Sequence, residues 1–437
     1  MKLAIIGAGI SGLTVAWRLG RDHAVTLIEA ADYLGGHTNT VDVEWDGVGY
    51  AVDTGFIVFN RRTYPGFTAM LAELGVASEE TSMTFSVRCD RTGLEYRGAD
   101  LNGFFAQRRN VLNPRFWNLL WDMVRFLRRA PALLAEDEQL TVGDYFRRER
   151  YSRAFREQYF LPMGSAVWSC PPGEFAKFPL RSLVDFYWNH GLLSWRDRPV
   201  WRVIRGGSRQ YVEAMRRRMQ AEVCLRTPVE RVERHADRVT VRTAGWVRDF
   251  DHVVFACHSD QALRLLGDGA TSAEREVLGC FPYVRNVAVL HTDDRVLPRC
   301  RRAWASWNYR IPAADASQAT VTYNMNLLQH LQAPVTFCVT LNGESWIDPS
   351  RVLRRIEYAH PLFDARRPAA QRRHGELLQA NRTSFCGAYW GHGFHEDGVN
   401  SGLAVCAALG AASAGAVSSE AWPVVVDAAK GTLAGVL

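Results

Sequence analysis

The sequence predicts an α/β fold with a Rossmann-type nucleotide-binding domain and at least one further lobe. The first observation is the opening stretch KLAIIGAGISGLTVAWRL, residues 2–19, which reads as an apolar strand, a glycine turn and apolar residues at helical spacing. The second is the strand-like stretch AVTLIEA, residues 24–30, which completes a β-α-β unit. The third is the length of 437 residues, because one hydrophobic core rarely serves more than about 250–300 residues.

The glycine turn carries the pattern G-x-G-x-x-G, formed by Gly7, Gly9 and Gly12. The first glycine permits the tight turn, the second lets a pyrophosphate approach the backbone, and the third lets the helix pack on the strand. The helix start adds free N–H groups and a positive dipole end for the phosphates. Glu29 ends the second strand, where an acidic side chain accepts hydrogen bonds from ribose hydroxyls. Together these features predict a dinucleotide site.

The overall composition is typical of a folded protein and argues against nucleic-acid binding. Hydrophobic residues make up 47% of the chain and charged residues 22%. The formal net charge is +6, and the basic residues are not gathered into a tail. A surplus this small and dispersed lacks the clustered basic face that nucleic-acid binding needs.

Cysteine usage and hydropathy predict a soluble cytoplasmic protein. The nine cysteines are scattered from Cys89 to Cys406 without a C-x-x-C pair, so neither a disulfide framework nor a zinc site is indicated. The first six residues already read as a strand, so we expect no signal peptide. No run approaches the ~18 consecutive apolar residues of a membrane span. Peripheral contact at the inner face of the membrane stays open.

Residues 29–37, EAADYLGGH, resemble the segment after the ribose-binding acid in the flavin-containing amine oxidase superfamily, which also holds protoporphyrinogen oxidases and carotenoid desaturases. The family has R-x-G-G-R there. This chain keeps Gly35 and Gly36 but has Tyr33 and His37 in place of the arginines. The resemblance implies FAD as the cofactor, with the glycine pair passing close to its pyrophosphate.

The resemblance continues through the middle of the chain. The stretch AVDTGFIVF, residues 51–59, is similar to the family segment in which Gly55 would bring backbone near the flavin ring. The stretch IRGGSRQYVEAM, residues 204–215, resembles the family's G-G-x-x-x helix entry. Residues 227–258 alternate like three short strands with polar turns, and Val229 matches the family residue whose backbone meets adenine. The family likeness implies that this β-element returns to the cofactor domain.

The stretch WGHGFHEDGVNSG, residues 390–402, could be a metal site or a glycine-rich cofactor contact. A zinc site would need His392, His395 and a carboxylate to converge with a second shell of partners. We expect no helix to hold the two histidines in this glycine-rich loop, so we predict no metal. The part EDGVNSG resembles the family's carboxy-terminal motif E-G-A-V-x-S-G, a helix start whose backbone N–H groups face the flavin.

The family resemblance therefore implies an amine-oxidase-like architecture. A discontinuous Rossmann-type FAD-binding domain would comprise residues 1–75, 200–265 and 380–437, and a mixed α/β substrate-binding domain residues 76–199 and 266–379. The cofactor-binding residues that it implies are Gly7, Gly9, Ser11, Gly12, Glu29, Ala30, Gly35, Gly36, His37, Gly55, Phe56, Val229, Gly387, Glu396, Asp397, Gly398 and Val399.

The family's amine oxidases hold a lysine near flavin N5 on a substrate-domain strand, and the candidate strand here, NVAVLHTDD at residues 286–294, contains none. The segments 302–312, 319–331 and 337–344, which are rich in aromatic residues and Asn, resemble a bacterial subgroup of NAD/FAD-binding, amine-oxidase-like proteins that are often associated with cyclopropane-synthase-like lipid methyltransferases. This likeness implies hydride transfer between flavin N5 and a carbon of a hydrophobic substrate, a fatty-acyl chain of a membrane lipid, in a desaturation, saturation or isomerisation. Two alternatives stay open: an amine oxidase that uses oxygen, and a non-catalytic flavoprotein partner of a lipid-modifying enzyme.

The stretch 108–134 has apolar residues at helical spacing, flanked by tryptophans and arginines. Such a helix suits contact with anionic lipid headgroups. It also suits a helix that packs its apolar stripe inside the protein and leaves its arginines in water, which is the interpretation we favour.

Candidate residues of the substrate slot follow from aromatic segments and from the family likeness. Phe394 falls where the family's amine oxidases place an aromatic ring facing the flavin. The other candidates are aromatic side chains with a polar group, in segments that we expect to border the slot: Tyr309, Tyr323, Trp390 and His392.

Overall fold

The computed structural model describes residues 1–137, 139–193, 198–313, 319–362 and 366–410. Its first layer is a parallel five-stranded sheet, whose strand order is β10-β2-β1-β14-β20. These strands are β1 (Lys2–Ile6), β2 (Ala24–Ile28), β10 (Ala221–Cys224), β14 (His252–Phe255) and β20 (Thr383–Phe385). Strands from the beginning, middle and end of the chain therefore share one sheet, and all five fall in the segments predicted for the cofactor domain.

Other elements cover both faces of the parallel sheet. Alternate residues of each strand point to opposite sides, so each strand contributes side chains to two cores. On β1, Leu3 and Ile5 enter one core and Ala4 and Ile6 the other. The first core is closed by α1 (Ile10–Leu19), α2 (Pro65–Leu74), α10 (Arg209–Arg218) and α15 (His395–Ala408). The second is closed by the antiparallel strands β11 (Val229–Arg234), β12 (Val239–Thr243) and β13 (Val247–Phe250), and by α11 (Ser259–Leu266), α12 (Ser272–Leu278) and α14 (Arg367–Arg372).

The second large sheet has seven strands in the order β19-β15-β18-β17-β16-β7-β8, antiparallel except between β16 and β7. These strands are β7 (Phe85–Cys89), β8 (Leu94–Arg97), β15 (Tyr283–His291), β16 (Trp307–Ile311), β17 (Val321–Asn324), β18 (Cys338–Leu341) and β19 (Val352–Pro361), with α13 (Met325–Leu328) after β17. Two small sheets complete the strands: β3 (Thr40–Trp45) with β4 (Val48–Asp53), and β5 (Val58–Asn60), β9 (Trp201–Ile204) and β6 (Ser78–Glu80).

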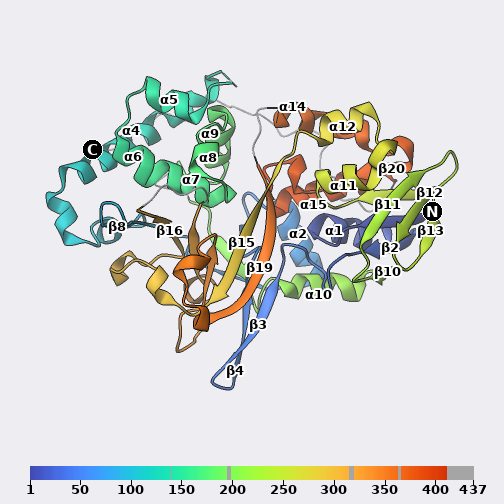
Figure 1. Cartoon of the computed structure of the whole chain (residues 1–437), viewed down its shortest axis with the longest axis horizontal. Coiled ribbons are helices and arrows are strands. Elements are labelled where there is room, and N and C mark those ends of the chain that lie inside the picture. The colour runs from blue at the N-terminus through green and yellow to red at the C-terminus, as the bar shows by residue number, and fades with distance from the viewer. Residues whose placement is uncertain (138, 194–197, 314–318, 363–365, 411–437) are drawn as a thin grey trace.

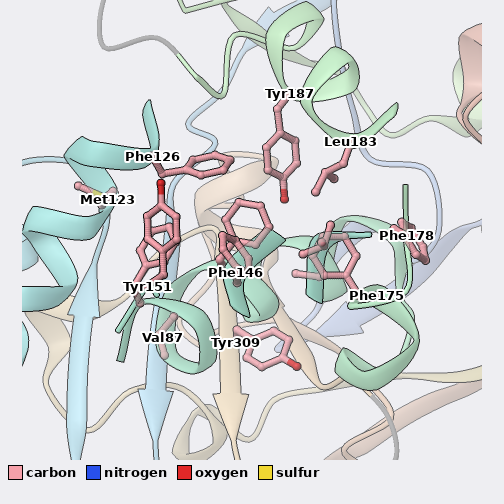
Figure 2. Close-up of a cluster of buried hydrophobic side chains, with 14 of the residues drawn as sticks. Val87, Met123, Phe126, Phe146, Tyr151, Phe175, Phe178, Leu183, Tyr187 and Tyr309 are labelled. Atoms are coloured by element: carbon pink, nitrogen blue, oxygen red, sulfur yellow. The ribbon is translucent and has the colours of Figure 1, made fainter. Parts of the chain in front are cut away.

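A helical layer packs beside the seven-stranded sheet. Its helices are α3 (Leu101–Phe104), α4 (Pro114–Arg129), α5 (Val142–Arg148), α6 (Arg153–Phe155), α7 (Leu161–Trp168), α8 (Pro172–Phe175) and α9 (Leu180–Asn189). Figure 2 shows Phe126, Phe146 and Tyr187 pointing into the common core of these helices. Figure 1 shows α4 at one end of the molecule and β10–β13 at the other, with the long strands β15 and β19 between them.

The packed cores cross the domain boundaries expected from the sequence. Val277 of α12 and Ala370 of α14 belong to a core built on the parallel sheet, although residues 266–379 were assigned to the substrate domain. Val43 and Val52 of the β3–β4 hairpin pack with the seven-stranded sheet, although residues 1–75 were assigned to the cofactor domain. The helices α12 and α14 therefore pack in the cofactor lobe, and the β3–β4 hairpin packs in the substrate lobe.

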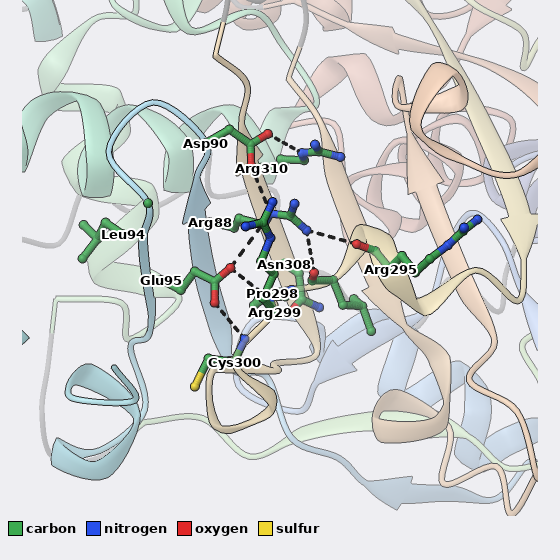
Figure 3. Close-up of polar contacts among 12 residues, drawn as sticks. Arg88, Asp90, Leu94, Glu95, Arg295, Pro298, Arg299, Cys300, Asn308 and Arg310 are labelled. Carbon is green, nitrogen blue, oxygen red and sulfur yellow. Dashed lines mark hydrogen bonds and ion pairs between the residues drawn. The ribbon is translucent and has the colours of Figure 1, made fainter. Parts of the chain in front are cut away.

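A polar network joins the β7–β8 hairpin to the loop after β15 (Figure 3). The buried carboxylate of Glu95 accepts hydrogen bonds from the backbone N–H groups of Arg299 and Cys300, at 2.9 and 2.8 Å. Arg88 donates to Asp90 at 3.0 Å and to the carbonyl oxygen of Leu297 at 2.8 Å. The network fixes the edge of the sheet.

In the part of the chain that the structure describes, no helix is long and apolar enough to span a bilayer.

Candidate cofactor and substrate site

A cavity of about 930 Å³ runs along the carboxyl ends of the parallel strands and continues into the helical lobe. It brings together residues that lie far apart in the sequence. The predicted cofactor-binding residues that line it are Gly7, Gly9, Ser11, Glu29, Ala30, Gly35, Gly36, His37, Gly55, Phe56, Val229 and Gly387.

The three glycines of the first turn have three different environments. Gly7 has a φ of +105°, which favours glycine, and its N–H donates to the carbonyl oxygen of Ile28 at 2.8 Å. A Cβ on Gly12 would overlap the carbonyl oxygen of Gly7, so this glycine allows α1 to pack against the turn. A Cβ on Gly9 would meet no atom within 4 Å, because Gly9 faces the open cavity. The turn therefore fits a pyrophosphate, which needs backbone free of side chains.

Glu29 is held at the end of β2 by the loops on both sides of it. One carboxylate oxygen accepts a hydrogen bond from the backbone N–H of Ala8 at 2.7 Å, and the other from that of Ala31 at 2.9 Å. Each oxygen keeps a further lone pair for a ribose hydroxyl. The carboxylate is thus oriented before any ligand arrives.

The second glycine pair lies directly on the first turn. The N–H of Gly35 donates to the carbonyl oxygen of Ala8 at 2.9 Å, and a Cβ on Gly36 would stand 3.1 Å from the Cα of Gly9. Gly35 and Gly36 have φ values of +124° and +59°. Tyr33, which stands where the family has an arginine, donates its hydroxyl to the carbonyl oxygen of Gly36 at 3.0 Å. Tyr33 therefore stabilises the loop.

The side chains of the first turn of α15 are used for packing. Glu396 and Asp397 border a smaller cavity, whereas Gly398 and Val399 border neither. Asp397 accepts a hydrogen bond from the N–H of Phe394 at 2.8 Å, and burial raises its pKa to about 7. A Cβ on Gly398 would stand 2.6 Å from Cγ2 of Ile10, so this glycine lets α15 pack on α1.

His395 is the first residue of α15, so our expectation that no helix holds it is wrong. Its Nε2 lies 2.9 Å from both the Thr38 and the Tyr211 hydroxyl oxygens, and its ring stacks on Phe56 with centroids 3.5 Å apart. Within the described part of the chain, no three His, Cys, Asp or Glu side chains are grouped as metal ligands. The stacking holds Phe56 against the cavity wall.

The structure divides the five substrate-slot candidates. Tyr323, His392 and Phe394 line the main cavity. Tyr309 is buried in the core of the helical lobe instead, and Trp390 stacks on His374 with ring centroids 4.0 Å apart.

The helical lobe and the adjoining seven-stranded sheet supply cavity residues that no sequence motif indicated. Their side chains are apolar or aromatic: Met83, Phe85, Met163, Val167, Trp168, Phe186, Leu192 and Trp307. No lysine is among the described lining residues, and the ammonium group of Lys177 pairs with Glu174 at 2.7 Å on the surface. The sequence has 14 tryptophans, a content that fits an aromatic cavity but also an aromatic core, so it does not indicate which residues line the wall.

The sequence was compared with known proteins once this geometry was established. The model of the flavin containing amine oxidoreductases matches residues 10–302. The AofH protein of Mycobacterium tuberculosis, named for the flavin-containing monoamine oxidases, is 25% identical over 252 residues, which are 55% of this chain and 53% of AofH. Coproporphyrinogen III oxidase of the same species is 40% identical over 84 residues, 18% of either chain. The chain thus spans about half the length of AofH, and its match to coproporphyrinogen III oxidase covers 18% of that protein.

Solved structures share the fold at low identity. Cyclohexylamine oxidase from Brevibacterium oxydans superposes with a TM-score of 0.65 at 17% identity, over 93% of this chain and 98% of that one. A fatty acid isomerase from P. acnes that produces CLA superposes with a TM-score of 0.63 at 13% identity, over 93% and 97% of the two chains. The predicted fold class and the predicted flavin cofactor are confirmed, because this chain belongs to the flavin-containing amine oxidoreductase family.

Proposed function

We propose that this protein is an FAD-dependent oxidoreductase that acts on the acyl chain of a membrane lipid, in a desaturation, saturation or isomerisation. The observation that carries the proposal is the continuity of the cavity, which leads from the glycine turns into an apolar chamber in the helical lobe. A hydrocarbon chain gains free energy from burial there at roughly 25 cal/mol per Å². The solved structure of a fatty acid isomerase has the same fold, which supports an acyl substrate.

The residues of this chain fit the cofactor at one end and an uncharged substrate at the other. Gly9 and Gly36 leave room for the pyrophosphate, and Glu29 is oriented for ribose. When bound, the flavin supplies a two-electron acceptor or donor. The apolar walls exclude water, which keeps the reacting carbon away from side reactions.

The polar groups in the chamber are neutral. Burial lowers the pKa of His392 to about 3, with smaller contributions from Arg367 and His190, so its imidazole carries no charge at neutral pH. Burial also raises the pKa of Tyr323 well above its usual range. No carboxylate is among the described residues of the chamber wall to hold an ammonium group. An acyl chain therefore fits this wall better than a charged amine does.

Amine oxidation is the second candidate. It is favoured by the family match and by aromatic walls, since the faces of Trp307 and Phe394 could attract an amine cation.

The surface near α4 suggests how a lipid substrate is reached. The apolar stripe of α4, including Phe116 and Phe126, packs inside the protein, which confirms the interpretation favoured from the sequence.

On the outer surface beside this stripe, Leu112, Trp117 and Trp121 are 87%, 49% and 69% exposed. The surrounding arginines form no ion pair within the described part of the chain; they are Arg108, Arg109, Arg115 and Arg128. Exposed tryptophan with unpaired arginine suits anionic lipid headgroups. A lipid methyltransferase partner, implied by the bacterial subgroup, stays a prediction.

The test mixes the full-length holoprotein with lipid vesicles without oxygen and monitors reduction of the flavin by its visible absorption spectrum. Desaturation transfers two electrons to the flavin, so vesicles whose lipids carry methyl-branched or unsaturated acyl chains should bleach it. An isomerisation leaves the flavin oxidised and should appear as a shifted double bond in the recovered lipid. For the reverse direction, pre-reduced protein should be reoxidised by unsaturated lipid without oxygen. Bleaching by amines alone, with peroxide formed on admitting air, would overturn the acyl proposal in favour of amine oxidation. A flavin that dithionite reduces but neither substrate class does, with the acyl chains recovered unchanged, would indicate the non-catalytic partner.

A further inference from the structure

Three histidines from distant segments meet on one wall of the cofactor cavity. His37 follows Gly36, His258 caps the start of α11, and His360 lies on β19. The ring centroid of His37 is 5.2 Å from that of His360 and 6.3 Å from that of His258. Three imidazoles thus form one cluster beside the glycine turns.

The cluster lies next to the place that fits a pyrophosphate. Gly9 faces open space in the first turn, Gly36 touches Gly9, and His37 is the next residue along the chain. The Nε2 atom of His37 is buried and has no hydrogen-bond partner among the described residues. A buried polar atom without a partner is unfavourable by about 1–3 kcal/mol, so His37 keeps a hydrogen-bonding position beside the glycine turns that no described residue uses.

The permanently charged side chains that line the cavity are mostly negative, so they disfavour binding of an anion. The described lining residues with fixed charge are Glu29, Glu230, Glu357 and Arg264, three negative and one positive, and none of the others is a lysine or arginine. A dinucleotide pyrophosphate adds two negative charges. The family's arginines are replaced by Tyr33 and His37, so beyond Arg264 any further positive charge among the described lining residues must come from histidines.

Without a ligand the cluster is neutral. Burial lowers the pKa of His37 and His258 to about 4 and of His360 to about 3, and each of the three is lowered further by a neighbour in the cluster. A hydrogen bond to the backbone of Ala359 opposes this shift at His37. The amide group of Asn286 lies 2.8 Å from Nδ1 of His360, to which it donates.

Of the other groups that face the cluster, only Arg264 on α11 is a permanent cation among the described cavity-lining residues. Tyr358 stacks on His37 and Tyr283 on His258, with centroids 5.0 and 4.3 Å apart, and burial raises both tyrosine pKa values. His395, on α15, is kept neutral by burial and by His37. The remaining charged or titratable neighbours are Glu29 and Tyr33 on the loop of His37, Glu357 beside Tyr358, and Asp260 and Arg264 on α11.

We propose that His37, His258 and His360 form the anion-binding wall for the flavin pyrophosphate, and that the cluster takes up a proton from solvent when the cofactor binds. An arginine would carry this charge permanently. Histidine carries it only when the anion is present, so binding and protonation are coupled. Affinity for FAD then falls as pH rises, by up to about tenfold per pH unit for each proton taken up.

The test measures FAD release from the full-length holoprotein by the fluorescence of free flavin after dilution, between about pH 6 and pH 8.5. We expect the dissociation constant to rise with pH in the wild type. His37→Arg should retain affinity and lose most of the pH dependence, whereas His37→Gln should weaken binding mainly at low pH. His235→Gln, on an exposed turn, is the matched control and should behave as wild type.

A second readout keeps the test independent of folding. Calorimetry of FAD rebinding in buffers of different ionisation enthalpy reports the protons taken up, and circular dichroism checks that each variant is folded. A wild-type affinity that is constant across this pH range, or binding without proton uptake, would overturn the proposal. So would a His37→Arg variant with the pH dependence of the wild type.

Discussion

The carboxylate of Glu396 on α15 accepts a hydrogen bond from the backbone N–H of Phe67 on α2, at 2.9 Å, across 329 positions of sequence. Its other oxygen accepts from the N–H of Gly66 at 2.8 Å. The helix α2 begins with Pro65, which has no N–H, after Tyr64, which does not cap it. Glu396 therefore supplies the cap that the local sequence lacks, and it also places a negative charge at the positive end of the helix.

Removing this cap should destabilise the protein. We expect Glu396→Ala to lower the free energy of unfolding by about 1–3 kcal/mol, because one buried and one partly buried N–H group lose their acceptor. Glu396→Gln keeps one acceptor oxygen and should lose less. Thermal unfolding of both variants measures the difference, and equal melting temperatures for Glu396→Ala and wild type would contradict it.

Two glycines of the same turn should respond oppositely to alanine. Gly9→Ala meets open space at a permitted φ of −70°, so it should leave the melting temperature nearly unchanged but weaken FAD binding. Gly12→Ala places its Cβ against the carbonyl oxygen of Gly7, so it should destabilise the fold itself. Melting curves and flavin content of the purified variants distinguish the two effects. A stable Gly12→Ala variant with normal flavin content would refute this account of the turn.

Filling the apolar chamber should separate the two candidate substrates. Val167→Phe on α7 adds bulk to the chamber wall, far from the glycine turns. We expect normal flavin content and at least an order-of-magnitude slower bleaching by acyl lipid, because the chain no longer fits. A small amine substrate should be affected less. Val247→Phe, at an exposed position outside the cavity, is the control and should match wild type in every assay.

The membrane proposal predicts binding to anionic vesicles. Burying a large apolar side chain contributes roughly 1.5–3 kcal/mol, so replacing both Trp117 and Trp121 with alanine should lower partitioning by at least about tenfold. Binding should also weaken with salt, since each arginine contributes about 1 kcal/mol near an anionic surface. Co-sedimentation with phosphatidylglycerol vesicles measures both effects. The double variant Leu327→Ala and Leu353→Ala changes exposed apolar residues elsewhere and should bind as wild type.

A buried ion pair should make stability depend on pH. Glu274 is 1% exposed, and its carboxylate lies 2.5 Å from the guanidinium group of Arg234. Burial alone would raise the pKa of Glu274, but the hydrogen bonds from Arg234 and Thr271 outweigh it and lower the pKa. Its contribution is therefore complete above the ordinary glutamate pKa of about 4.3 and is lost as pH falls.

Glu274→Gln tests this dependence, because it leaves Arg234 without its counter-charge. We expect a loss of about 3–5 kcal/mol at neutral pH, measured by urea unfolding. The difference from wild type should narrow when the measurement is repeated near pH 4. A difference that stayed constant or widened toward acid would show that the pair does not titrate in this way.

The cofactor end could be predicted from the sequence because its signals are local. Gly7, Gly9 and Gly12 act within one turn, and Glu29 follows the next strand directly, so spacing alone indicates what each can do. The use of Glu396 as a helix cap could not be predicted, because its partners lie on a helix that only the tertiary fold brings near. The same holds for the histidine cluster, whose members come from three segments.

The substrate end was predicted less well because the sequence does not show how far along its aromatic strands the cavity extends. Trp307 and Tyr323 are cross-strand neighbours on β16 and β17, and both line the cavity. Tyr309 is only two residues farther along β16, opposite Val321, and already lies within the helical core. The sequence indicated aromatic strands but not where along them the cavity ends.

The spread of the parallel sheet along the chain also bears on biosynthesis. Its last strand, β20, pairs with β14 only after residues 383–385 have left the ribosome. Until then β14 has an unpaired edge, which is open to pairing with another chain. Pairings between such distant segments form slowly. The nascent polypeptide therefore cannot complete its flavin pocket before residues 383–385 have emerged, so flavin supply and protection by chaperones matter most until that stage.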